Sequence, residues 1–305
     1  MSDAFVADAD VPAGSSCERV SRPPRGLRAL GRRVGRNRLA ALGGTFALVV
    51  VLLGVTASWV APYDPIEQNT ARRLEDPSGD HLLGTDQFGR DILSRILFGS
   101  RTTLLVSTMA VGIAVVVGGT LGLLAGYLGG RVERGVTMLV DVLLSFPLIL
   151  LAIMVVVILG PGVVNLAIAI GVAQVPIFAR LGRALTLAAR EREFVVAARG
   201  LGATSGRIMA RHLLPNIAAP LGIQATTTLA LAVLSATSLS FLGLGVQPPT
   251  PDWGAMINDS KRFIFDRPEL SLYPGAAIAL TVLSLNLLGD GLMDELDPMA
   301  RAQGT

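Results

Sequence analysis

The sequence has few charged residues. Asp, Glu, Lys and Arg make up 16% of its 305 residues, whereas a soluble domain carries about 25%. Apolar residues make up 51% and the mean hydropathy is +0.58. This composition excludes a water-soluble enzyme and predicts an all-α polytopic membrane protein. Helices are expected because strand-like alternation is absent and open strands leave backbone groups unsatisfied in lipid.

The chain also lacks the residues of common catalytic and metal sites. Its single cysteine, Cys17, excludes an internal disulfide. Its two histidines, His81 and His212, lie far apart and lack partner ligands for a metal. No Gly-x-x-x-x-Gly-Lys-Ser/Thr phosphate-binding loop is present. We therefore expect no enzymatic activity, no metal and no bound cofactor in this chain, and any ATP hydrolysis must come from another chain.

Six apolar segments are long enough to cross a membrane, which takes about 20 helical residues. They cover residues 39–61, 102–128, 136–159, 163–178, 217–244 and 272–292. A tight turn at residues 160–162 separates the third span from the fourth. We expect kinks at Pro147 and Pro176. Small residues that permit close helix approach recur in the second span, at Gly118, Gly119, Gly122 and Gly126.

The basic residues predict the orientation of the spans. If both termini are cytoplasmic, 18 of the 26 Lys and Arg residues lie on the cytoplasmic side and eight on the outer side. That distribution fits the excess of positive charge found in cytoplasmic loops. The first apolar run is too long for a secretory signal and lacks a cleavage site at its end, so we expect a retained span.

This orientation divides the chain into five parts. We expect a basic, partly disordered cytoplasmic tail over 1–38, whose stretch 25–38 either lies on the anionic inner leaflet or acts only as a topology signal. The first transmembrane helix covers 39–61, and an extracytoplasmic loop with an interfacial helix covers 62–101. A core of five helices covers 102–293 and includes a cytoplasmic loop over 181–215. A cytoplasmic tail covers 294–305.

Two features are predicted for the outer side. Asp91 and Arg95 are four residues apart and can pair on the interfacial helix, whose apolar face would hold Ile92, Leu93, Ile96 and Leu97. A Pro-rich run at 248–251 followed by Trp253 predicts a stiff loop with an aromatic anchor at the membrane interface.

Few polar side chains fall within the spans. Asp141 and Asp290 lie near the inner boundary and would serve either proton or cation coupling, or structure, as a cap or an ion pair with Arg131, Arg134 or the loop arginines. We favour the structural role. The hydroxyl residues of the fifth span face either a water-filled path or neighbouring helices: Thr226, Thr227, Thr228, Ser235, Thr237, Ser238 and Ser240.

A polar, arginine-rich stretch interrupts the apolar pattern between the fourth and fifth spans. Strong helix formers dominate 184–198, Gly200 and Gly202 then break the helix, and Thr204 or Ser205 can cap a second short helix. Leu214 precedes Pro215 and is therefore expected outside the helical region. An apolar stripe of Leu187, Phe194, Val195, Ala198 and Leu201 needs a surface to cover it, so a docking element is favoured over a passive linker.

This stretch resembles the EAA loop of the permease subunits of ABC importers. Ala197, Ala198, Gly202, Leu214 and Pro215 match the loop, whereas Val196 stands where glutamate is usual and His212 where isoleucine is usual. In that family the loop forms a coupling helix that sits in a cleft of the ATPase subunit. The resemblance implies the following coupling residues: Glu193, Val196, Ala197, Ala198, Gly202, Ile208, His212, Leu214 and Pro215.

Residues 81–95, 240–254 and 286–298 are similar to C-type permeases of dipeptide, oligopeptide and nickel importers, so the resemblance covers about 26–300. It implies a type I ABC importer permease fold and a role in di- or oligopeptide transport. The implied partners are a second permease, two ATPase subunits that bind ATP and Mg²⁺, and an extracytoplasmic solute-binding protein. The expected location is the inner membrane of a bacterium or archaeon. The alternative, a stand-alone secondary transporter or channel, would need charge near the midplane.

Overall fold

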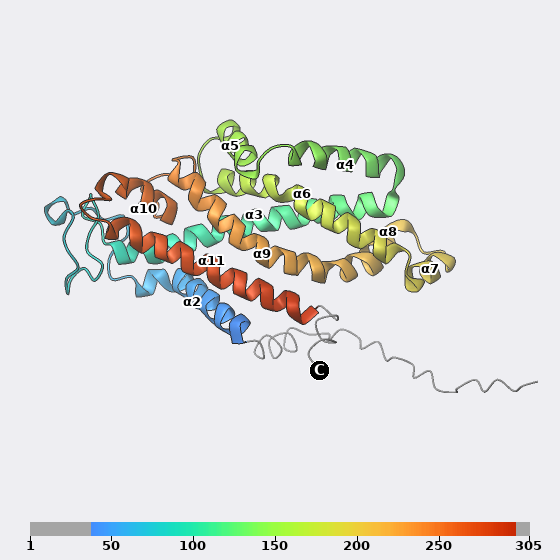
Figure 1. The fold of residues 1–305 in the computed structure, drawn as a ribbon, viewed down its shortest axis with the longest axis horizontal. Helices are drawn as coiled ribbons and strands as arrows, with labels where there is room; N and C mark the ends of the chain where they lie inside the picture. Colours follow the sequence, from blue (N-terminus) through green and yellow to red (C-terminus); the bar gives the residue numbers. More distant parts are fainter. Residues whose placement is uncertain (1–37, 297–305) are drawn as a thin grey trace, which may run out of the picture.

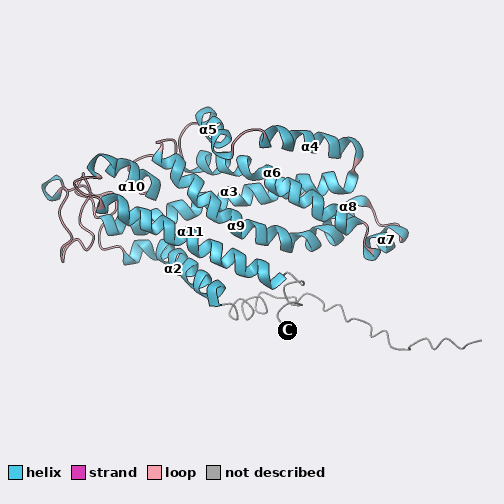
Figure 2. Ribbon diagram, viewed as in Figure 1, coloured by secondary structure: helices cyan, strands magenta, loops and turns pink. Residues whose placement is uncertain are grey.

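The computed structural model describes residues 38–296, and the predictions for the two terminal tails lie outside the described residues. Apart from one isolated bridge between Thr85 and Asp91, the described part of the chain contains helices and loops only (Figure 2). The longer helices are α2 (Arg38–Val60), α3 (Ile92–Leu128), α4 (Gly130–Leu144), α5 (Leu148–Leu159), α6 (Val163–Arg190), α9 (Leu214–Phe241) and α11 (Glu269–Leu296). The all-α prediction is confirmed.

The helices form an elongated bundle (Figure 1). Helices α2 and α11 pack together along one long edge, while α4 and α5 lie along the opposite edge and pack on α6. Helices α3, α6 and α9 lie between these edges. At one end, loop 61–91 and α10 (Trp253–Ser260) form what we call the α10 layer. At the other end lie α7 (Glu193–Gly200) and α8 (Ser205–Ile208).

Five helices are long and apolar enough to cross a membrane, and the bent pair of α4 and α5 makes a sixth span if it is counted as one. The sequence predicts a third span with a kink, whereas the structure has two separate helices that meet at 94°. Pro147 disfavours the helical region for Phe146 and takes an extended conformation itself, at the N-cap of α5. The chain therefore stops α4 and starts α5 in a new direction.

The most extensive close contact in the bundle joins α3 and α6. A Cβ atom added at Gly118 would lie 2.5 Å from the Val175 carbonyl oxygen, and one at Gly122 would lie 2.5 Å from the Ala179 carbonyl oxygen. One turn further, a Cβ at Gly126 would lie 2.7 Å from Thr186 Cβ. The predicted close approach is confirmed, since backbones can meet this closely only where small residues repeat every fourth position.

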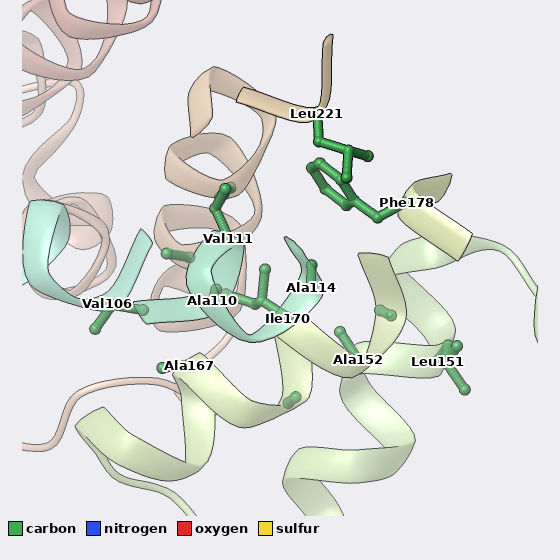
Figure 3. Close-up of a cluster of buried hydrophobic side chains, with 14 of the residues drawn as sticks. Val106, Ala110, Val111, Ala114, Leu151, Ala152, Ala167, Ile170, Phe178 and Leu221 are labelled. Carbon is green, nitrogen blue, oxygen red and sulfur yellow. The ribbon is translucent and has the colours of Figure 1, made fainter. Parts of the chain in front are cut away.

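The apolar core continues from this contact toward α5 and α9. Ala110 and Ala114 of α3 are fully buried beside Ile170 of α6, and Phe178 points toward Leu221 of α9 (Figure 3). Lipid is as apolar as these side chains, so the contact depends on close packing rather than on removal of surface from water.

We predict that Gly118→Ala destabilises the protein, because the new methyl group would meet backbone atoms that have nowhere to move. The free energy of unfolding should fall by about 1–3 kcal/mol, measured by SDS-induced unfolding in mixed micelles. Gly112→Ala on the same helix is the matched control, because a Cβ there has nothing within 4 Å. Equal stability of the two variants would contradict the close contact.

Candidate functional site

The predicted loop helix is divided in two. Helix α6 does not end near residue 178, as predicted, but continues to Arg190, and α7 begins at Glu193. The first half of the expected helix over 184–198 thus belongs to α6 and packs against the end of α3. Its strong helix formers explain why the helix persists after the apolar span is complete.

The glycine corner has the predicted shape. Gly202 has a φ of +79°, and the Ala203 N–H donates to the Ala198 carbonyl oxygen at 3.1 Å, as in a Schellman cap. Gly200, by contrast, is still helical. The Thr204 hydroxyl accepts a hydrogen bond from the Arg207 N–H and caps α8. Helix, glycine corner and second helix are confirmed.

The expectation that Leu214 leaves the helical region is wrong, since its φ and ψ are −52° and −47°. Residues Met209–Leu213 form a π-helical turn, in which the Leu214 N–H donates to the Met209 carbonyl oxygen. This wider turn accommodates the ring of Pro215, which would clash with a regular α-helical turn. As a result α8 and α9 run together as one span over Ser205–Phe241.

Three apolar side chains attach the loop to the bundle. Val195, Ile208 and Leu213 are fully buried and belong to the same core cluster as α3 and α6. The predicted apolar stripe is therefore split, because Val195 faces inward and Ala198 is half-buried. The loop is therefore fixed to the bundle by side-chain packing as well as by its chain connections to α6 and α9.

Several of the remaining apolar side chains of the loop are exposed. Leu201 is 89% exposed, and Phe194 and Val196 also face outward. Of the other implied coupling residues, Glu193, Ala197, Gly202, Leu214 and Pro215 are exposed and His212 is half-buried, whereas Ile208 is buried. We call Phe194, Val196, Ala197, Leu201 and Gly202 the loop surface. Such an apolar patch on a structured loop is typical of an interaction site.

The rim of the loop surface is positively charged. Arg192, Arg199, Arg207 and Arg211 are exposed, and none forms an ion pair with another described residue. A partner that covered the apolar centre would therefore meet guanidinium groups around it, and acidic residues on that partner would complement them.

A polar groove of about 610 Å³ runs along the α4 edge. Two ion pairs hold its lining carboxylates: Arg180 donates to Asp141 at 3.2 Å, and Arg183 Nε donates to Glu133 at 2.9 Å. The first ion pair fits the structural role favoured for Asp141, although Arg180 lies in α6, just before the loop predicted over 181–215. Both side chains of that pair are more than half exposed, and a charge exposed to hydrocarbon is costly. This face of the bundle therefore needs water or protein beside it.

The hydroxyl residues of the fifth span lie mainly inside the bundle. Thr228, Ser235, Thr237 and Ser240 are buried, and the hydroxyls of Ser235 and Thr237 donate to carbonyl oxygens of α9 itself. Of the two roles left open by the sequence, helix contact fits these four residues. The second carboxylate singled out, Asp290, is exposed on α11.

Asp86 is the centre of the α10 layer. Its carboxylate accepts from Arg90 Nε at 2.6 Å and lies 3.6 Å from Arg95 Nε, and both guanidinium groups are 3% exposed. Asp259 adds a second carboxylate at 3.4 Å from Arg90. The predicted pairing of Asp91 with Arg95 is wrong. Asp91 instead caps α3 by accepting from the Ser94 N–H and lies 3.0 Å from His81 Nδ1.

The predicted helix leading into the second span is present, whereas the predicted aromatic anchor is wrong. The segment from Ile92 is the first part of the 37-residue helix α3, and the loops of the α10 layer bury it. Trp253 is 2% exposed and its indole N–H donates to the Ile96 carbonyl oxygen at 3.0 Å. The neighbouring Asp252 caps α10, and burial raises the pKa of its carboxyl. In the sequence, the only sign of this packing between α3 and α10 is an aspartate in the capping position before each of the two helices, Asp91 and Asp252.

The chain resembles known transport proteins along most of its length. A family model for the inner membrane component of binding-protein-dependent transport systems matches residues 118–302, and one for the N-terminal TM domain of oligopeptide transport permease C matches residues 28–77. The dipeptide transport system permease protein DppC of Alkalihalophilus pseudofirmus is 44% identical over 271 residues, which cover 89% of each chain.

Two further relatives have similar coverage. The di/tripeptide transport system permease protein DppC of Pseudomonas aeruginosa is 43% identical over 281 residues, or 90% of this chain and 93% of the relative. The glutathione transport system permease protein GsiD of Pectobacterium atrosepticum is 42% identical over 272 residues, or 89% of this chain and 90% of the relative.

We predict that Asp86→Asn strongly destabilises the α10 layer, because Arg90 and Arg95 stay buried but lose a shared carboxylate. Breaking a buried ion pair in this way costs about 3–5 kcal/mol, measured as the free energy of unfolding in mixed micelles. Asp80→Asn is the control, since its exposed pair with Arg72 contributes at most about 1 kcal/mol. A smaller loss for Asp86→Asn than for Asp80→Asn would contradict this account of the layer.

Proposed function

The chain belongs to the family of inner membrane components of binding-protein-dependent transport systems, and from this premise we infer that it carries di- or oligopeptides through an ATP-driven importer. It is a multi-pass membrane protein and a permease subunit of an ABC importer. Family membership replaces the alternative of a stand-alone secondary transporter or channel. The relatives above are named for dipeptides, di/tripeptides and glutathione, which supports small peptides as the cargo.

The exposed loop surface is the observation that carries the coupling role. A leucine that is 89% exposed, with Phe194 and Val196 exposed on the same loop, indicates a surface made for a partner. This chain has no phosphate-binding loop, so we propose that the partners are two ATPase subunits that bind ATP and Mg²⁺. The loop surface, ringed by arginines, would sit in an apolar cleft with an acidic border.

The way the loop is attached supports transmission of force. Val195, Ile208 and Leu213 join it to the core, and the loop is continuous with α6 on one side and α9 on the other. When ATP closes the ATPase pair, the loop and these two helices would move together. The bundle would then switch between inward-open and outward-open states, and ATP hydrolysis would reset it.

The other partners follow from the remaining surfaces. We propose that a homologous second permease covers the α4–α5 edge, which carries exposed apolar side chains on α5 and the groove with Asp141 and Arg183 along α4. Cytoplasmic termini, as the arginine distribution indicates, place the α10 layer outside, where a solute-binding protein would deliver peptide. We place the importer in the inner membrane of a bacterium or archaeon.

Leu201→Ser tests the docking surface directly. Loss of a leucine that becomes buried on docking should weaken ATPase binding about tenfold or more, since such burial contributes about 1.5–3 kcal/mol. Binding of the purified ATPase to the permease pair in nanodiscs measures this. Stability should not change, because the side chain is exposed in this chain. Leu82→Ser, exposed at the opposite end, is the control, and equal ATPase binding by both variants would refute the docking surface.

Gly202→Ala tests the glycine corner. Alanine in the left-handed region is strained by about 1–2 kcal/mol, so the corner should distort and the ratio of peptide uptake to ATP hydrolysis should fall in proteoliposomes that hold the assembled importer. Gly206→Ala is the matched control, because this glycine lies in α8 with an ordinary φ and open space around it. Fully coupled uptake by the Gly202 variant would argue against the loop as the coupling element.

A further inference from the structure

An apolar groove of about 380 Å³ lies between α2, α3, α9 and α11. Of these helices, α2 and α11 form the edge of the bundle opposite α4 and α5 (Figure 1). Its walls are one face of α3, including Leu105 and Thr108, and one face of α2, including Val51 and Gly54. Leu229 of α9 also lines it. Leu105 and Val51 are about half exposed, so this chain leaves the groove open.

Arg101 is the one charged residue that lines this groove. It is exposed, and its side chain makes no hydrogen bond or ion pair with the described residues. Arg90, Arg95 and Arg267 of the same half of the bundle all lie beside carboxylates. An unpaired cation on a membrane-spanning helix marks a functional site by default, because its cost must be offset by a ligand.

The level of Arg101 in the membrane is fixed by its contact with α2. A Cβ added at Gly54 would lie 3.2 Å from the Arg101 backbone nitrogen, so the two residues are level. Trp59, 83% exposed on α2, lies about 7.5 Å further along the helix axis and is typical of a residue at the headgroup boundary. The guanidinium can therefore extend to the headgroups while its stem stays among apolar side chains.

The groove then continues inward from Arg101. It reaches Ala47, about 10 Å from Gly54 along α2, which approaches the depth of one leaflet of about 15 Å. A ligand that fits has a negative charge at the interface and an apolar chain pointing to the midplane.

We propose that this groove binds an anionic phospholipid of the outer leaflet. Its phosphate pairs with Arg101, and one acyl chain lies along Leu105 and Val51 toward Leu229. No acidic residue lines the groove, so nothing there would receive the ammonium group of a zwitterionic headgroup. Assignment to the outer leaflet rests on the proposed orientation, whereas binding itself does not depend on transport. The lipid would fill the open space between α2 and α3.

Native mass spectrometry of the full-length chain in detergent tests this proposal, with dioleoylphosphatidylglycerol as the probe and dioleoylphosphatidylcholine as the comparison lipid. The chain should retain one phosphatidylglycerol in preference to phosphatidylcholine. Arg101→Gln should weaken that binding at least about tenfold, because charge-assisted hydrogen bonds to the phosphate are lost. Arg101→Lys should lie between the two, since lysine keeps the charge without the bidentate geometry.

Two controls separate the groove from general charge and surface effects. Arg73→Gln removes an exposed arginine of the α10 layer and should leave lipid binding unchanged. Leu105→Trp should block the groove and weaken binding although Arg101 is present, whereas Leu42→Trp, exposed on α2 outside the groove, should not.

Equal retention of phosphatidylglycerol by Arg101→Gln and the unaltered chain would overturn the proposal, as would equal binding of both lipids. A cross-link from Leu105→Cys to the second permease in membranes would also overturn it, because protein would then cover the groove. None of these measurements uses transport, so a failure here is distinct from a failure of the proposed function.

Discussion

The close contact of α3 with α6 is the constraint on which the rest of the structure depends. Gly118, Gly122 and Gly126 let the two backbones meet, and each helix carries one end of the molecule. Helix α3 begins under the α10 layer, where Asp91 caps it and Trp253 bonds to its Ile96 carbonyl. Helix α6 continues into the loop with the exposed Leu201. The contact thus joins the two faces at which the proposed partners would act.

The two ends of the bundle bury different kinds of side chain, and this difference fits their different proposed partners. The α10 layer buries charge: Asp86, Arg90 and Arg95 satisfy one another away from solvent, which fixes one arrangement of an irregular loop. The opposite end buries only Val195, Ile208 and Leu213 and leaves its apolar and basic side chains exposed. A packed α10 layer at one end and an uncovered loop surface at the other fit a subunit whose loop surface becomes buried only when the importer assembles.

Local chemistry explains what could be predicted. The spans follow from apolar length, and the corner at Gly202 and the cap at Thr204 depend on residues adjacent in sequence. The errors arise where distant residues compete. Asp91 could pair with Arg95, but capping α3 and contacting His81 occupy its carboxylate, and Asp86 lies beside Arg95 instead. Pro147 predicts a break but not its 94° angle, and burial of Trp253 depends on Gly99, far away in sequence.

The central claim is that the loop around Leu201 seats against an ATPase subunit. The most direct measurement is disulfide cross-linking in native membranes between Leu201→Cys and single cysteines along the cleft of the ATPase, with Cys17 replaced by serine. The account predicts a cross-link from position 201 to the ATPase and none from Leu82→Cys at the opposite end. Absence of any cross-link at position 201, in an importer that still transports peptide, would contradict it.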